Sequence, residues 1–311
     1  MKRRTFLKYS ASTLVLPSVS TSLNASEYTT IEKQLFPVNF FSKFFTSDKE
    51  EKKEILKKEV NKKEIVTEKT VEIKEVVKKI EPVEIVEKKN NIFLEKQYIK
   101  EFVSVREKLK NVQSYIGHGN FNLISFDEMV KASKNFNKLE TFSKKELDFL
   151  EYIFYYNPSS HGFYGERVSQ NITDKINKKE VVKIPHTGHY LFKGEPEKVY
   201  YQMIEDIGES LTLTSGVRSI IKQTKLFLDK VDSVNGNLAV ASKSLAPPAF
   251  TYHSIADFDV GKKGFGFDNF TARFALTEEF IHMRKLKYID MRYTINNKDG
   301  VRYEPWHVKI I

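Results

Sequence analysis

A group of side chains near the C-terminal end of the sequence is of the types that hold a metal ion and activate water. His253 and His307 flank a stretch that contains Asp257 and Asp259, and Glu304 lies just before the second histidine. Two histidines and a carboxylate are the usual protein ligands of a catalytic zinc that keeps one position open. A further glutamate supplies a base for water. These residues therefore predict a zinc site with hydrolytic chemistry.

The elements expected around these residues give a mixed α+β fold. Alternating apolar residues predict a strand over 211–214, after which residues 215–219 turn the chain into a helix. Arg218 lies at this junction, a common place for a residue that points at a ligand. The helix is expected to bury a stripe formed by Ile220, Thr224, Phe227 and Val231. Gln223 is expected to lie outside this stripe.

Further elements close the domain. Residues 256–260 are expected to form a strand, in which Asp257 and Asp259 share one face. A single helix is expected from Thr271 to about Leu286, followed by closing strands over 288–293 and 306–310. We therefore predict an α+β fold, with a small antiparallel sheet flanked by helices that carries the zinc site.

Three segments together resemble the zinc D-alanyl-D-alanine carboxypeptidases of the VanY type. The resemblance covers roughly residues 205–311, with the segments in the family's order. The three segments are Ser215-Gly216-Val217-Arg218-Ser219, Thr251-Tyr252-His253 with Asp259, and Glu304-Pro305-Trp306-His307. The last of them is the most specific.

The resemblance implies a role for each matching residue. The zinc ligands would be His253, Asp259 and His307, with Glu304 as the base that activates water. Arg218 would stabilise the oxyanion. Substrate contacts would come from Arg218 and from three further residues, namely Gln223, Thr251 and Trp306.

The aspartate position departs from the family pattern. The family places its ligand one position further from the histidine, where this sequence has Val260, which cannot bind zinc. Asp259 is the favoured ligand because the following Val260-Gly261 resembles the family's exit from the strand, and Asp257 remains the alternative. Thr251 stands where serine is usual, which is a mild chemical change.

The activity implied is removal of the terminal D-Ala from peptidoglycan stem peptides. An endopeptidase or an L,D-carboxypeptidase would use the same zinc chemistry, so these functions remain open. A non-catalytic wall-binding module is a further alternative, although it would not need Glu304. The sequence does not specify an oligomeric state.

Residues 92–204 are expected to form an appended, mainly helical subdomain. Two capping boxes start helices, one at Ser125 with Glu128 and one at Ser143 with Glu146. Asn157-Pro158 is expected to end the second helix. The histidines of the segment 184–190, His186 and His189, are expected to be structural or to line the substrate site.

The first 91 residues are expected to export and tether the protein. Residues 1–26 resemble a twin-arginine signal, with Lys2-Arg3-Arg4-Thr5-Phe6-Leu7-Lys8 followed by an apolar run too short to span a membrane. Residues 27–91 contain an aromatic patch and a Lys/Glu-rich segment that reads as a disordered tether. We therefore expect a periplasmic protein with no stable membrane span after signal removal.

Composition limits the chemistry and the partners. The sequence has 311 residues, a formal net charge of +10 and no cysteine. The absence of cysteine excludes disulfides, a thiol nucleophile and a Cys-based zinc site. A basic exterior favours anionic partners such as cell-wall polymers, and no clustered basic helix points to nucleic acid.

Overall fold

A computed structural model describes residues 91–311. These residues fall within one compact unit that ends at Ile311. The predicted signal over 1–26 and all but the last residue of the predicted tether over 27–91 lie outside the described residues. Among residues 91–311, no helix combines the length and the apolar composition that crossing a membrane requires.

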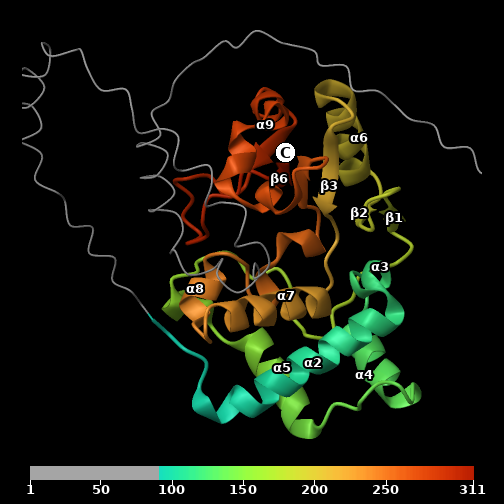
Figure 1. Ribbon diagram of the computed structural model, residues 1–311, viewed down its shortest axis with the longest axis vertical. Helices are drawn as coiled ribbons and strands as arrows, with labels where there is room; N and C mark the ends of the chain where they lie inside the picture. The colour runs from blue at the N-terminus through green and yellow to red at the C-terminus, as the bar shows by residue number, and fades with distance from the viewer. Residues whose placement is uncertain (1–90) are drawn as a thin grey trace, which may run out of the picture. The chain divides into compact units, whose positions relative to one another are not determined.

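The first part of the described chain is helical. A short 3-10 helix, η3 (Lys96–Tyr98), leads into a series of helices that occupies the lower part of Figure 1. The helices of this series are α2 (Ile99–Ile116), α3 (His118–Phe121), α4 (Phe126–Asn135), α5 (Lys144–Tyr155) and η4 (Pro158–His161). Both predicted capping boxes are confirmed at the starts of α4 and α5. Helix α5 ends just before Asn157-Pro158, as expected.

Two small antiparallel sheets and further helices make up the second part. The first sheet pairs β1 (Val181–Lys183) with β2 (Tyr190–Phe192). The second has the order β3-β4-β6-β5, formed by Leu211–Ser215, Phe258–Lys262, His307–Ile310 and Ile289–Met291 respectively. The helices are α6 (Glu195–Ile207), α7 (Ile220–Ser233), α8 (Leu238–Ser242) and α9 (Glu278–Met283), with short 3-10 helices η5 (Pro248–Phe250), η6 (Tyr252–Ser254), η7 (Gly266–Phe270) and η8 (Ala272–Leu276). The predicted α+β fold is confirmed.

The register of the four-stranded sheet brings distant residues together. Strand β4 pairs with both β3 and β6, so Asp259 faces Ser215 on one side and His307 on the other. The register shifts between Leu213 and Ser215, an irregularity that re-aims the end of β3. The sheet therefore places the carboxylate of Asp259, the imidazole of His307 and the start of the 215–219 turn next to one another.

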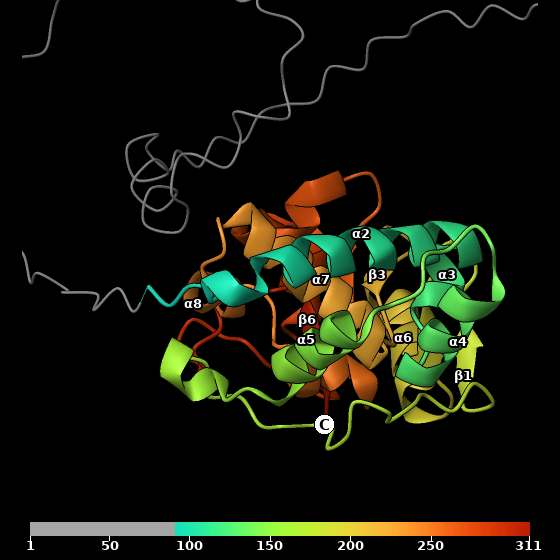
Figure 2. The ribbon, with the colours of Figure 1, turned by 90° about the horizontal axis from the view of Figure 1, so that it is seen from below.

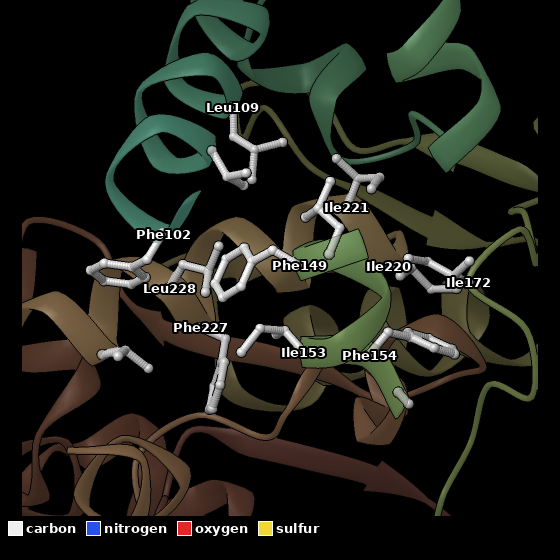
Figure 3. Packing of buried hydrophobic residues seen from close by; sticks show 14 of the residues in the cluster. Phe102, Leu109, Phe149, Ile153, Phe154, Ile172, Ile220, Ile221, Phe227 and Leu228 are labelled. Atoms are coloured by element: carbon white, nitrogen blue, oxygen red, sulfur yellow. The ribbon is translucent and has the colours of Figure 1, made fainter. Parts of the chain in front are cut away.

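Two hydrophobic clusters support this sheet. The first joins α2 and α5 to α7, with Phe102, Phe149 and Phe227 among its buried side chains (Figure 3). The second lies around the four-stranded sheet and includes Phe258 and Trp306. Figure 1 shows α7 between the helical part and the strands, and Figure 2 gives the same elements seen from below. The first cluster therefore draws on both sides of the predicted boundary at 204/205, and that boundary stays a prediction.

Three local expectations are corrected. The single helix predicted over 271–286 is divided into η8 and α9, because the side chain of Thr277 accepts a hydrogen bond from the amide of Phe280 and starts a new helix. Strand β4 begins one residue after Asp257. Gln223 is buried although the predicted stripe excluded it, because its amide hydrogen-bonds within the protein.

The carboxylate of Glu146 links α5 to α2. Lys108 of α2 donates to it at 2.7 Å, the amide of Ser143 donates at 2.6 Å, and the hydroxyl of Ser104 also donates. Its side chain is 7% exposed. Burial alone would raise the pKa of Glu146, but the hydrogen bonds from Lys108 and Ser104 lower it to about 2.

We expect Glu146→Gln to lower the free energy of unfolding at pH 7 by about 1–3 kcal/mol, because a buried, charge-assisted hydrogen-bond acceptor is lost. A carboxyl whose pKa is depressed by folding stabilises the protein above its ordinary pKa of 4.5. The difference between the two proteins should therefore shrink as the pH falls from 4.5 to about 2.

Urea denaturation of the full chain at several pH values measures this difference. Glu151→Gln is the matched control, because Glu151 is exposed on the same helix. A difference for Glu146→Gln that stays constant down to pH 2 would show that its charge does not stabilise the fold.

Candidate active site

His253 lies in η6 and is held by the turn that follows β3. Its Nδ1 lies 2.9 Å from the carbonyl oxygen of Gly216, and its Nε2 lies 3.3 Å from Oδ1 of Asp259. Position 216 requires glycine because a Cβ there would lie 2.0 Å from the carbonyl oxygen of Tyr190. That same oxygen accepts a hydrogen bond from the amide of Val217 at 2.7 Å. This close approach of two backbones fixes the carbonyl that orients His253.

His307 is the first residue of β6 and contacts a different carboxylate with each ring nitrogen. Its Nδ1 lies 3.1 Å from Oδ1 of Asp259, and its Nε2 lies 2.9 Å from Oδ2 of Asp257. The rings of His253 and His307 meet edge to face, with their centroids 4.9 Å apart. Both side chains are nearly fully buried.

Asp259 provides the feature that fits a metal ion. Its Oδ2 accepts a hydrogen bond from Nη2 of Arg218 at 2.5 Å. Its Oδ1 is buried and has no hydrogen-bond partner within residues 91–311, although it faces nitrogens of both His253 and His307. One donor atom from each of these three residues lies within 4.8 Å of the others. A buried anionic oxygen beside two imidazole nitrogens fits a cation such as Zn²⁺.

The charges in this group are strongly coupled. Burial lowers the pKa of His253 to about 4, with a further contribution from Arg218. Burial would raise the pKa of Asp259, but the neighbouring His253 and Arg218 hold it well below its ordinary value. Burial would also lower the pKa of His307, but its contacts with Asp257 and Asp259 raise it to about 9. The site therefore holds an ionised carboxylate at neutral pH.

Arg218 is fixed by three acceptors. Its Nε donates to Oγ of Ser215 at 2.8 Å, its Nη1 donates to Oε1 of Gln223 at 3.4 Å, and its Nη2 donates to Asp259. Gln223 is in turn held by the carbonyl of Ala246 at 2.7 Å. These contacts use three of the five guanidinium N–H groups, so the group retains capacity for a further acceptor.

Glu304 lies beside the three-residue group. Its Oε2 is 4.0 Å from Nδ1 of His307, and its Oε1 is 3.6 Å from Nε of Arg302. The amide of His307 donates to the carbonyl of Glu304 at 3.2 Å, which closes a turn before β6 and brings both side chains to one side. Burial raises the pKa of Glu304 to about 7, close to the pH at which a general base is most effective.

Two other residues with predicted substrate contacts are packed within the protein. Thr251 is 2% exposed and Trp306 is 3% exposed. The ring of Trp306 packs edge to face against Phe270 and lies under the guanidinium of Arg302. The substrate-binding roles of Thr251 and Trp306, like that of the buried Gln223, stay predictions.

The histidines of the 184–190 segment lie outside the metal-compatible group. His186 is exposed and has a positive φ of 61°. His189 is half-buried just before β2, and burial together with the nearby positive charge of Arg218 lowers its pKa to about 4. His189 therefore lies within electrostatic range of Arg218, and its role stays a prediction.

Sequence reasoning missed Arg292. This residue follows β5 and makes an ion pair with Asp257, the aspartate that was considered as the alternative ligand. Asp257 and Arg292 are far apart in sequence, and no local motif links them. Only the pairing of the strands brings them together.

Comparison with known proteins relates this part of the chain to a family of peptidases, which are hydrolases. The family model VanY, described as D-alanyl-D-alanine carboxypeptidase, matches residues 198–311. The resemblance seen in the sequence is therefore confirmed over residues 198–311. No curated protein matches the chain.

Several solved structures are similar to the chain at low sequence identity. A mutant of the vancomycin resistance D,D-pentapeptidase VanY in complex with Zn(II) has 19% identity and a TM-score of 0.34, over 42% of this chain and 78% of that one. The D,D-dipeptidase VanXYg with a D-Ala-D-Ala phosphinate analog has 21% identity and a TM-score of 0.40, over 48% of this chain and 62% of that one. The LD-carboxypeptidase LdcB has 24% identity and a TM-score of 0.34, over 50% of this chain and 70% of that one.

We expect Asp259→Ala to abolish stoichiometric zinc binding, because it removes the only carboxylate oxygen that faces both imidazoles in the described structure. Metal analysis of the purified full chain after zinc loading and dialysis measures the bound zinc. Asp268→Ala, which changes an aspartate of η7 away from this group, is the control. Retention of one zinc per chain in Asp259→Ala would exclude Asp259 as a ligand and favour Asp257.

Proposed function

We propose that the protein is a zinc-dependent D,D-carboxypeptidase that removes the terminal D-Ala from peptidoglycan stem peptides. The observation that carries this proposal is the buried, unpaired Oδ1 of Asp259 between His253 and His307, within a segment that matches the VanY family. The D,D specificity is inferred from the description of that family.

The residues that would hold zinc are His253, Asp259 and His307. When bound there, zinc would supply Lewis-acid chemistry, which acidifies water and polarises a carbonyl group. His253 would present Nε2, because its Nδ1 is taken by the carbonyl of Gly216. His307 would present Nδ1, because its Nε2 is taken by Asp257. Three protein ligands leave a further position open, as catalytic zinc sites require.

Glu304 would act as the general base. Its carboxylate lies next to His307, one of the residues that would hold zinc. It would accept a proton from the attacking water and deliver it to the amine of the departing D-Ala. General acid–base catalysis of this kind contributes typically about 10²–10⁴-fold in rate.

Arg218 would stabilise the developing negative charge on the scissile carbonyl oxygen. Ser215, Gln223 and Asp259 hold its guanidinium in place, so its remaining N–H groups are aimed before substrate arrives. Preorganised donors of this kind avoid reorganisation during the reaction, and loss of one typically costs about 10²–10³-fold in rate.

We expect Glu304→Gln to lower the rate of D-Ala release by at least about 10²-fold while zinc stays bound, because the amide cannot accept the proton but Glu304 is not in the ligand group. Mass spectrometry of pentapeptide muropeptides after incubation with the zinc-loaded full chain measures the loss of one alanine. Glu278→Gln is the control, because Glu278 is exposed in the first turn of α9. Loss of zinc from Glu304→Gln would show that Glu304 is a ligand.

The same experiment separates the alternative functions. Conversion of cross-linked dimers to monomers would identify an endopeptidase. Shortening of tetrapeptide stems, with pentapeptides unchanged, would identify an L,D-carboxypeptidase. No change in any muropeptide while zinc is bound would favour a wall-binding module.

We also propose that residues 1–26 are a twin-arginine export signal and that the protein works in the periplasm. The proposal rests on the Arg3-Arg4 pair followed by a polar residue, Phe6 and Leu7. A substrate in the cell wall requires export, which supports the same location.

We expect residues 1–30 to export a fused reporter that crosses the membrane only when folded, and we expect Arg3→Lys combined with Arg4→Lys to stop that export. Cell fractionation followed by detection of the reporter measures the outcome. Lys2→Arg, which leaves the pair intact, is the control. Equal export with and without the arginine pair would argue against a twin-arginine route.

A further inference from the structure

A buried ion pair lies on the side of His307 that faces away from Asp259. Arg292 donates from Nη2 to Oδ1 of Asp257 at 3.1 Å, and its Nε also donates to Oδ2. The side chain of Asp257 is 3% exposed and that of Arg292 is 17% exposed. Two parallel N–H donors on one carboxylate fix its plane as well as its position.

Asp257, held in this orientation, in turn fixes the ring of His307. Its Oδ2 lies 2.9 Å from Nε2 of His307. An ionised carboxylate can only accept, so when a cation takes the place of a proton on Nδ1, the remaining proton of the His307 ring belongs on Nε2. Nδ1, which lies 3.1 Å from Oδ1 of Asp259, is then the nitrogen left to the cation. The carboxylate thus selects the tautomer that a metal on Nδ1 needs.

Arg292 also contacts the segment that carries the other histidine. The centre of its guanidinium lies 3.5 Å from the ring centroid of Tyr252, which immediately precedes His253. The carbonyl of Tyr252 accepts a hydrogen bond from the amide of Asp257 at 3.3 Å. One arginine therefore braces Tyr252, Asp257 and, through Asp257, His307.

We propose that Asp257 and Arg292 are positioning residues that set the tautomer and orientation of His307 for zinc. This inference rests on the proposed zinc site, to which it adds the residues that prepare one ligand before the metal arrives. Residues that hold a metal-bound histidine in this way typically change metal affinity about 10–100-fold when they are replaced.

A purely structural ion pair would behave differently. Its loss would lower the stability of the fold without changing the affinity of correctly folded protein for zinc. A positioning pair changes zinc affinity in protein that remains folded. Zinc affinity and the protonation of the His307 ring are therefore the informative measurements.

The variants Asp257→Asn and Arg292→Lys test the inference in the full chain. Asp257→Asn keeps the shape of the side chain but removes the charge that favours the Nε2–H tautomer. Arg292→Lys keeps the positive charge but removes the two-pronged contact and the stacking on Tyr252. Competition with a zinc chelator gives the Kd for zinc alone, and circular dichroism confirms folding.

We expect Asp257→Asn to raise the zinc Kd about 10–100-fold and Arg292→Lys to raise it in the same direction by a smaller factor. Arg106→Lys is the matched control, because Arg106 also joins carboxylates to an aromatic ring, namely Asp229, Asp232 and Phe102, but lies on α2. Its zinc Kd should equal that of the unchanged protein. Nitrogen NMR of zinc-loaded protein should show the His307 proton on Nε2 and the metal on Nδ1.

The outcomes separate this inference from the proposed function. Zinc binding by the unchanged chain, with Kd values of both variants within about twofold of it, would overturn the positioning role and leave the zinc site standing. If Asp257→Asn does not fold, Arg292→Lys decides by the same criterion. Failure of the unchanged chain to bind zinc would overturn the proposed function, and this inference would fall with it.

Discussion

The negative charge of Asp259 is the constraint on which the site depends. An ionised carboxylate inside a protein is costly unless it is paired and hydrogen-bonded. Arg218 compensates one oxygen, while the other faces His253 and His307 without a hydrogen bond in the described structure. An arrangement that leaves half of a buried carboxylate unpaired is stable only with a cation, either a proton on an imidazole or a metal ion. The site therefore has the charge and the geometry to hold a cation between Asp259 and the two imidazoles.

The two hydrophobic clusters explain how this charge is held in place. Asp259 lies in the central part of a four-stranded sheet, where β4 is paired on both sides, and its neighbours in register are Ser215 and His307. Arg218 stands just before α7, which packs into the first cluster with α2 and α5. The acid and its arginine thus come from elements anchored in different cores. Their short contact joins the two cores at the site.

The sequence predicted those features whose physical causes are local. Capping boxes at Ser125 and Ser143 satisfy amides within one helical turn, so α4 and α5 could be read from a few residues. The motif around Arg218 and the Glu304–His307 segment also carry their signal within a few positions. The prediction of a single helix over 271–286 was wrong because the apolar spacing continues across Thr277, whose side chain caps a new helix. Gln223 was misplaced because its partners, Arg218 and Ala246, lie outside its own helix.

The contrast between the two aspartates could not be predicted for the same reason. Asp257 and Asp259 are two positions apart, and each contacts one nitrogen of His307 and one arginine. In Asp257 both oxygens are occupied, since Arg292 contacts each of them and His307 contacts Oδ2. In Asp259 one oxygen stays open.

What separates an orienting carboxylate from a ligand is therefore the number of donors that distant strands bring to each. Sequence spacing made the two aspartates nearly equivalent. The position of Arg292 after β5 removes that equivalence, because it saturates Asp257 and leaves Asp259 as the carboxylate with a free lone pair beside both imidazoles. The pairing of β5 with β6 thus determines which of the two aspartates, Asp257 or Asp259, is available to a metal.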